Sequence, residues 1–439
     1  MNHVVKKAPL TALLFSLVYL VLLSSTSLAE NTVLDYAETK VNLSKWSLPK
    51  FSENQWQNAT AQAEKIILGW QDQAITVPWT NLTLEYFVKH KMQPSRGARA
   101  LALIHVAMFD ALHHPESKNY DSHITASVAA AMVLGYLFPA EEHTFMRLVQ
   151  KVMELKTAST DFDDAVLSAI NLGQVIGQQL IQYAENDGAQ RGWNGKRLQW
   201  YGEGRYYGPG AWEPTPPYYY FPPDEPFAPS WKPWVLKEPS QFRPEPPPVY
   251  GTEAFIAALD EVIEVDKNLT VQQKQVAKFW VDGHGTVTPA GHWNQIATQL
   301  LAKHELNDHQ TAQVFMQLNV AMADTFIAAW DSKYHYWYIR PVTAAKKIKG
   351  LDFKPYILTP PFPSYVSGHA ATSGAASLVL AHYFPDAAKT INAMGGEAAH
   401  SRLLGGIHFK FDNDQGLKLG KQIAQLVIDN YSLEISHAK

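Results

Sequence analysis

Cysteine is absent from the 439 residues of this sequence. Its absence excludes disulfide bonds, thiolate metal sites and cysteine nucleophiles. Positive charge is also scarce, because 37 lysine and arginine residues face 41 aspartate and glutamate residues, and the formal net charge is −4. A mildly acidic chain without a basic stripe is a poor candidate for binding nucleic acid or an anionic membrane surface.

The first 29 residues contain one long apolar run, at positions 10–23, and no run of comparable length and apolarity follows it. Lys6 and Lys7 precede this run, and small residues ending at Ala29 follow it, as in a secretory signal peptide. The run is short for a membrane span, so an uncleaved anchor is the less favoured alternative. We therefore expect export to the periplasm or the extracellular space, and no stable membrane span in the mature protein.

The period-two alternation of β-strands is almost absent, and no repeat of solenoid length occurs. From about residue 55 to 184, apolar or small residues recur every three or four positions, as on one face of a helix. The pattern returns after residue 251, where Thr270 and Gln273 form a plausible capping box. We therefore predict an all-α fold of two helical bundles. In the second bundle we expect helices at about 252–265, 271–283, 289–303, 308–339, 368–384, 385–404 and 413–430.

Residues 193–250 are crowded with proline, tyrosine and tryptophan. Such a density of proline forbids long helices, while the aromatic residues argue against a solvated linker. We interpret this stretch as an ordered connecting segment that packs across the two bundles. The predicted domains are a signal peptide (1–29), an N-terminal bundle (30–192), the connecting segment (193–250) and a C-terminal bundle (251–439).

Three short clusters in the C-terminal bundle contain the residues suited to catalysis. The first is Lys333 with Arg340 and Pro341. Residues seven apart on a helix point in nearly the same direction, and Pro341 is placed to end that helix, with Arg340 in its last turn. A lysine and an arginine at this spacing are more often two solvated surface residues. The aromatic residues between them argue against a solvated face.

The second cluster is Ser367, Gly368 and His369, between a proline-rich loop and an alanine-rich helix. Free amides at the helix start, the serine hydroxyl and a glycine that permits close backbone approach form a seat for an anion. The alternative is a serine N-cap followed by a surface histidine.

The third cluster is Ser401 and Arg402, followed by Gly405, Gly406 and His408. The two glycines predict a helix end that turns the chain and presents His408. A lone histidine there is more often structural. Together, however, the three clusters provide cations, a hydroxyl, a glycine amide and two imidazoles, which suit the binding of a tetrahedral oxyanion and nucleophilic or acid-base chemistry at it.

This combination resembles the superfamily of type 2 phosphatidic acid phosphatases and vanadium-dependent haloperoxidases, whose signature is K-x6-R-P, then P-S-G-H, then S-R-x5-H. Residues 333–341 and 401–408 match fully, while Val366 stands where a proline usually precedes Ser-Gly-His. Residues 280–294 and 99–111 are similar to segments of the bacterial haloperoxidase-like members. The resemblance implies two four-helix bundles, with the cofactor in the second.

For a haloperoxidase, the resemblance implies that vanadate is the cofactor and that His408 is the metal ligand. His369 would accept a proton from hydrogen peroxide. Lys333 would polarise the peroxide, so that halide is oxidised to hypohalous acid. The vanadate-binding residues would be Lys333, Arg340, Ser367, Gly368 and Arg402.

The alternative from the same superfamily is a secreted acid phosphatase without a cofactor, in which His408 forms a phosphohistidine and His369 protonates the leaving oxygen. Chain length, the two-bundle pattern and the upstream segments favour a haloperoxidase. A catalytically silent anion-binding protein is less favoured, because both histidines are retained. Asp282 and His292 are candidates for supporting or entrance groups. The expected partners are small molecules, and halide preference, organic substrate and oligomeric state are left open.

Overall fold

The computed structural model describes residues 32–34, 53–70, 73–156, 164–192, 198–202 and 205–431. Over these residues the named elements are all helices, an isolated β-bridge joins Ala211 and Tyr338, and there is no strand. The predicted all-α fold is confirmed. None of the described helices is both long and apolar enough to cross a membrane. The predicted signal peptide lies outside the described residues.

Contacts divide the chain into two compact units. The first unit contains residues 1–71 and 107–180, and the second contains residues 72–106 and 181–439. Helices α4 and α7 contribute residues to both units. The domain boundaries expected from the sequence, at residues 192 and 250, stay predictions.

The first unit is a helical bundle in which α6 packs against α2 and α5. Helix α5 begins at the N-cap Asp121, whose carboxylate accepts the Ile124 N–H at 3.1 Å. Helix α7 approaches α5 closely, because a Cβ on Gly173 would lie 2.6 Å from the Thr125 carbonyl oxygen. The elements here are α2 (Glu53–Ile67), η2 (Pro115–Asn119), α5 (Ser122–Leu137), η3 (Pro139–Glu141), α6 (Glu142–Lys156) and α7 (Asp164–Asn186).

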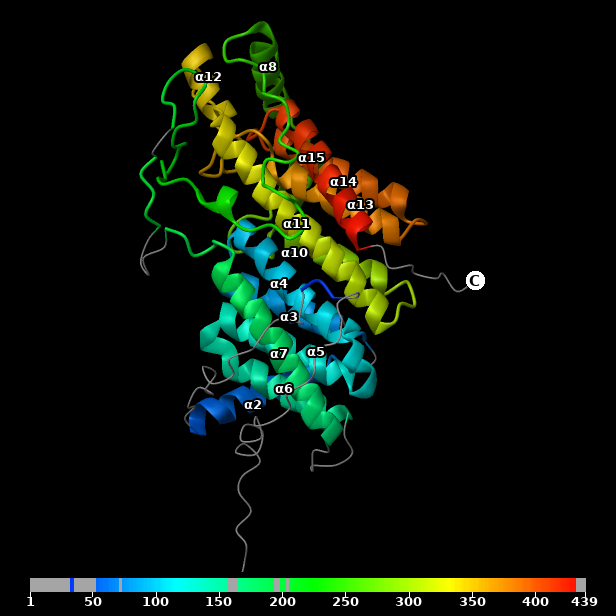
Figure 1. The fold of residues 1–439 in the computed structure, drawn as a ribbon. Coiled ribbons are helices and arrows are strands. Elements are labelled where there is room, and N and C mark those ends of the chain that lie inside the picture. Colours follow the sequence, from blue (N-terminus) through cyan, green and yellow to red (C-terminus); the bar gives the residue numbers. More distant parts are fainter. Residues whose placement is uncertain are drawn as a thin grey trace, which may run out of the picture. The chain divides into compact units, whose positions relative to one another are not determined.

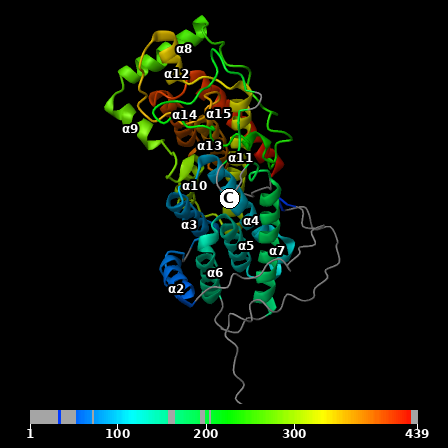
Figure 2. The same cartoon turned by 90° about the vertical axis from the view of Figure 1, so that its left-hand side faces the viewer.

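The second unit is built around α13, which packs against α10, α11, α14 and α15. Figure 1 shows α13 and α15 lying alongside the long helix α11. Helix α8 packs against α12 at one end of the unit, as Figure 2 shows. The elements of this unit are α3 (Thr76–Lys89), α4 (Pro94–His113), η4 (Ala228–Ser230), α8 (Glu253–Lys267), α9 (Val271–Phe279), α10 (Thr288–Leu301), α11 (Asp308–Tyr336), α12 (Pro341–Lys349), α13 (Gly368–Tyr383), α14 (Ala388–Leu404) and α15 (Lys410–Asn430).

Glycines hold α13 and α15 close together. A Cβ on Gly420 of α15 would lie 1.9 Å from the Ala371 carbonyl oxygen, and a Cβ on Gly374 of α13 would lie 2.4 Å from the Leu417 carbonyl oxygen. Any side chain at these positions would push the two backbones apart. Because α13 begins at Gly368 and α15 begins two residues after His408, this contact brings two of the predicted site clusters together.

The proline-rich and aromatic segment packs against α11, as expected of an ordered segment. The buried Asp324 carboxylate accepts the backbone N–H groups of residues 234–236 at 2.8 to 3.0 Å. Arg243 donates two hydrogen bonds to Asp331, at 2.7 and 2.8 Å, and the Tyr336 hydroxyl donates to the Pro244 carbonyl oxygen at 2.5 Å. The segment therefore covers the part of α11 that leads to Lys333.

One predicted helix is wrong at its end. The sequence predicted a helix over 308–339 with Arg340 in its last turn, but α11 ends at Tyr336 because Trp337 adopts a left-handed conformation with φ 51°. Pro341 does not end this helix. It is the first residue of the next one, α12, which the sequence analysis missed, and Arg340 is its N-cap.

Residues 337–339 leave the helical conformation to pair with residues 210–212. The Trp212 N–H donates to the Trp337 carbonyl oxygen at 2.7 Å, and the Ile339 N–H donates to the Gly210 carbonyl oxygen at 2.9 Å. This pairing with a distant segment explains why local spacing did not show where α11 ends.

Gly420→Ala should lower the unfolding temperature strongly, because the new methyl group would collide with backbone that cannot move without separating α13 from α15. Gly396→Ala is the matched control, since it lies inside α14 with open space around its Cβ position. There alanine should stabilise the helix, by about 1 kcal/mol. Thermal unfolding of both variants tests the packing. Equal stability of the two would contradict it.

Candidate active site

Lys333 lies near the end of α11 and is fully buried. Its Nζ donates to the carbonyl oxygens of Pro363 and Ser364, each at 2.9 Å, and lies 5.0 Å from the centre of the Phe362 ring. Burial lowers the pKa of Lys333 well below its usual value, and the nearby Arg340 lowers it further. Its neighbours therefore orient the ammonium group without supplying a full counter-charge.

Arg340 is also fully buried. Its Nε donates to the Phe362 carbonyl oxygen and its Nη1 to the Ile407 carbonyl oxygen, both at 2.8 Å. Nη1 also lies 3.1 Å from Nε2 of His408, which joins the first cluster to the third. Nη2 is buried and has no hydrogen-bond partner among the described residues. A buried donor of this kind needs an acceptor that the protein does not provide.

The start of α13 carries the second cluster. The Ser367 hydroxyl accepts the Ala370 N–H at 3.3 Å, so the serine is an N-cap, as the alternative reading proposed. His369, however, is not a surface residue, since its side chain is only 13% exposed. A Cβ on Gly368 would lie 3.2 Å from the Trp330 ring and 4.0 Å from Lys333 Cε, so this backbone approaches α11 closely.

His408 has a defined hydrogen-bond partner on each ring nitrogen. Its Nδ1 lies 2.8 Å from the buried Asp412 carboxylate, which also accepts hydrogen bonds from the Ser364 hydroxyl at 2.5 Å and the Phe409 N–H at 3.2 Å. Because a carboxylate only accepts, the proton of the neutral ring is on Nδ1. The lone pair of Nε2 then points to the side where Arg340 lies.

The electrostatics of this pair follow from burial. Burial lowers the pKa of His408 well below its usual value, and Arg340 and Lys333 lower it further. Burial also raises the pKa of Asp412, to about 6, although the Ser364 hydroxyl stabilises its charge. The imidazole is therefore neutral at pH 7, which is the form that can bind a metal or attack phosphorus.

Arg402 and His369 lie on the other side of the cluster. Arg402 is 2% exposed and donates from Nε to Ser401 Oγ at 2.9 Å and from Nη2 to the Ala277 carbonyl oxygen at 3.3 Å. His369 Nε2 lies 3.4 Å from the Asp282 carboxylate. Burial lowers the pKa of His369 to about 4, and Arg402 adds to the lowering.

The structure thus brings the three predicted clusters to one place, while the role of each residue stays a prediction. Three buried cations face two buried carboxylates, Asp412 and Asp282, in this part of the described chain. Burial lowers the pKa of Arg340 to about 9 and that of Arg402 to about 10. These lowered pKa values reflect a lack of negative charge around the three basic side chains, which, with the free donor of Arg340, fits a tetrahedral oxyanion. The predicted residues gathered here are Lys333, Arg340, Ser367, Gly368, His369, Arg402 and His408.

Asp412 was missed by the sequence analysis, which did not identify the partner of His408. Its signal was available, because Asp412 lies four residues after His408, in the first turn of α15. Asp282 and His292 were identified as candidates, and the structure places both beside His369: His292 Nδ1 lies 3.0 Å from Asp282.

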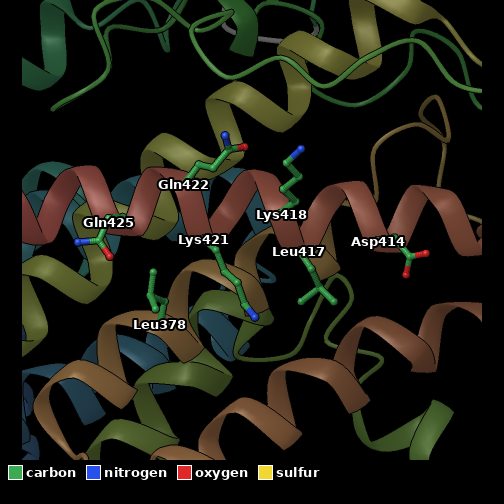
Figure 3. Close-up of a pocket in the computed structure, with 7 residues that line it drawn as sticks. All are labelled: Leu378, Asp414, Leu417, Lys418, Lys421, Gln422 and Gln425. Atoms are coloured by element: carbon green, nitrogen blue, oxygen red, sulfur yellow. The ribbon is translucent and has the colours of Figure 1, made fainter.

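Two further features of the described residues differ from this cluster. No group of three or more histidine, aspartate or glutamate residues in the described ranges could hold a metal ion. Figure 3 shows a shallow surface hollow bordered by Leu378 of α13 and by α15 residues that include Lys421 and Asp414. Its lining contains no histidine or arginine, unlike the buried cluster.

Comparison with known proteins relates this chain to haloperoxidases. Residues 313–390 and 387–436 match the model of the second helical-bundle domain of vanadium chloroperoxidase. The vanadium chloroperoxidase of Curvularia inaequalis is 29% identical over 132 residues, covering 24% of this chain and 22% of that enzyme. The matched region therefore spans less than a quarter of the length of this curated relative.

Two solved structures share the fold. A bacterial vanadium-dependent iodoperoxidase superimposes with a TM-score of 0.69 at 24% identity, covering 90% of this chain and 100% of the other. A holo-type bacterial vanadium-dependent chloroperoxidase superimposes with a TM-score of 0.61 at 19% identity, covering 77% and 92% of the two chains. At these identities the likeness shows the fold alone.

The His408 ring should remain neutral, with its proton on Nδ1, at pH 6.5, where half of an ordinary imidazole is protonated, because its pKa lies well below the usual value. Nitrogen-15 NMR of the histidine side chains measures this directly. Asp412→Asn should give a mixture of ring tautomers, since an amide accepts the Nδ1 proton less strongly and can donate to that nitrogen instead.

Asp414→Asn is the control for this measurement, because Asp414 lies in the same turn but is paired with the exposed Lys410. A His408 ring that titrates near pH 6.5 in the unaltered protein would contradict the assignment. The depressed pKa also has a consequence for stability. Below pH 6.5 the unfolded chain binds the proton more readily than the folded chain, so this histidine destabilises the fold as the pH falls.

Proposed function

We propose that this chain belongs to the superfamily of vanadium-dependent haloperoxidases and type 2 phosphatidic acid phosphatases. We further propose that it is a vanadate-dependent haloperoxidase, which uses hydrogen peroxide to oxidise halide. The observation that carries the proposal is the buried cluster of Lys333, Arg340 and Arg402 around a neutral His408. The match of residues 313–436 to a chloroperoxidase domain and the haloperoxidase folds of the neighbours support it.

The residues of the cluster fit vanadate. Lys333, Arg340 and Arg402 would neutralise its oxygens, and the unpaired Nη2 of Arg340 is a donor ready for one of them. The backbone at Gly368 can approach the anion because this position lacks a Cβ. His408 would ligate through Nε2, because Asp412 holds the proton on Nδ1. Bound vanadate supplies Lewis-acid activation of hydrogen peroxide, without a change in its own oxidation state.

His369 is the residue that we assign to proton transfer. Hydrogen peroxide must lose a proton before it becomes a good nucleophile, and a neutral imidazole next to the oxyanion seat can accept it. Burial keeps the His369 ring neutral, since its pKa falls to about 4. The Asp282 carboxylate, 3.4 Å from Nε2, stabilises the charge that the ring gains when it takes the proton.

The proposal predicts that the purified, metal-free protein acquires peroxide-dependent halide oxidation when orthovanadate is added. Bromination or chlorination of a reporter dye measures this activity, and hydrolysis of an aryl phosphate is measured in parallel. An acid phosphatase with the same residues would hydrolyse the ester without added cofactor and would be inhibited by vanadate. That result, without halide oxidation, would contradict the proposal.

Two variants separate the roles of the histidines. His408→Ala should abolish both vanadate binding and activity, while His369→Ala should keep vanadate binding and lose turnover, by about 100-fold or more. His400→Ala is the control, because His400 is exposed on α14 near Arg402. Equal loss of vanadate binding in the two active-site variants would contradict the assigned roles.

We also propose that the protein is exported. The support is the sequence of residues 1–29, with Lys6 and Lys7, the apolar run and the small residues before Glu30. These residues lie outside the described part of the structure. The absence of cysteine is compatible with export, since this protein does not depend on the formation of disulfide bonds.

A further inference from the structure

Asp282 is shared by two histidines. His292 Nδ1 lies 3.1 Å from Oδ1 and 3.0 Å from Oδ2, and His369 Nε2 lies 3.4 Å from Oδ2. All three side chains are 13% exposed or less. Because a carboxylate only accepts hydrogen bonds, the close nitrogen of His292 carries a proton and donates it to Asp282. His292 therefore competes with His369 for the same acceptor.

The loop that carries Asp282 is held in an unusual conformation. Asp282 has φ 41°, and Thr288, at the start of α10, has φ 69°. A positive φ is rare for any residue other than glycine, and rarer still for a β-branched residue such as threonine. Such strain persists only where the surrounding structure fixes the backbone. The loop between α9 and α10 is thus shaped to bring the Asp282 carboxylate to both histidines.

His292 is itself fixed by aromatic side chains. Its ring stacks on Trp280 with centroids 4.6 Å apart, and Phe279 meets it edge-on at 4.8 Å. The Trp280 Nε1 donates to Glu397 of α14 at 3.0 Å, which anchors the stack. The histidine ring is therefore held in one orientation, with Nδ1 directed at Asp282.

Charged groups on several elements act on this network. Arg402 of α14 faces both Asp282 and His369, and it lowers the pKa of His369. His369 in turn contributes to the lowering of the pKa of His408. Burial raises the pKa of Asp282, but the hydrogen bond from His292 and the nearby His369 ring outweigh it and keep that pKa below the usual value. Within the described residues, Asp282 is the carboxylate that faces His369.

We propose that His292 is a positioning residue for His369. By donating a hydrogen bond to Asp282, His292 fixes that carboxylate and weakens its interaction with His369. The His369 ring therefore stays neutral and able to accept a proton. The inference rests on the proposed function for its catalytic meaning. With His369 as sole partner, Asp282 would stabilise the protonated imidazole more strongly. An already protonated ring cannot act as the base for hydrogen peroxide.

The test is an NMR titration of the His369 ring in the vanadate-free, full-length mature protein, with its signal assigned by its loss in His369→Gln. His292→Leu removes the hydrogen-bond donor. His292→Asn has as many heavy atoms as the leucine variant but keeps an N–H donor. The leucine variant should raise the midpoint of His369 by about half a pH unit or more, and the asparagine variant by less than half as much. His284→Gln, an exposed histidine of the same loop, should leave it unchanged.

His292→Phe provides a second donor-free variant that keeps a ring to stack on Trp280, in case leucine prevents folding. An unchanged His369 midpoint in the folded donor-free variants, or an equal rise in His292→Asn, would overturn the inference. In the vanadate-loaded enzyme, the acidic limb of the rate profile should move in the same direction as the midpoint. If vanadate gives no halide oxidation but the midpoint still shifts, the proposed function fails and the positioning role of His292 stands.

Discussion

The second unit depends on one constraint, which is that three basic side chains are buried at the same site. Lys333, Arg340 and Arg402 are each at most 2% exposed. Removing such charges from water costs several kcal/mol for each ion. The two carboxylates Asp412 and Asp282 and a set of carbonyl oxygens offset part of this cost. Under the proposed function, a bound oxyanion would supply the missing negative charge, so the feature that costs stability would also favour binding of the ligand.

The surrounding fold serves to hold these charges in place. Glycines at 374 and 420 let α13 and α15 pack closely, and the Ser367 N–H at the start of α13 donates to the Asp412 carbonyl oxygen of α15 at 3.0 Å. The proline-rich segment covers α11 and pairs with residues 337–339, which turns Arg340 out of that helix and into the cluster. Asp412 fixes His408, and Asp282 lies beside both His292 and His369. The site is thus assembled from elements that are distant in sequence but rigidly packed.

The sequence predicted the all-α fold and every cation and histidine of the cluster, because helical periodicity and motif spacing are local properties. It did not predict that α11 ends at Tyr336, because that end depends on Trp337 pairing with a segment more than a hundred residues earlier. Asp412 could have been found from its spacing to His408. The sharing of Asp282 by His292 and His369 could not, since only the packing of α9, α10 and α13 brings these three residues together.

The central claim is that the buried cations form one oxyanion site, and the unfolding temperature of the metal-free protein with orthovanadate tests it most directly. At matched ionic strength, vanadate should raise this temperature above that in chloride, with saturation at one anion per chain. Arg340→Gln should remove the increase, and Arg243→Gln, which alters a cation paired with Asp331 outside the cluster, should keep it. No increase with vanadate, or the same increase in both variants, would contradict the account.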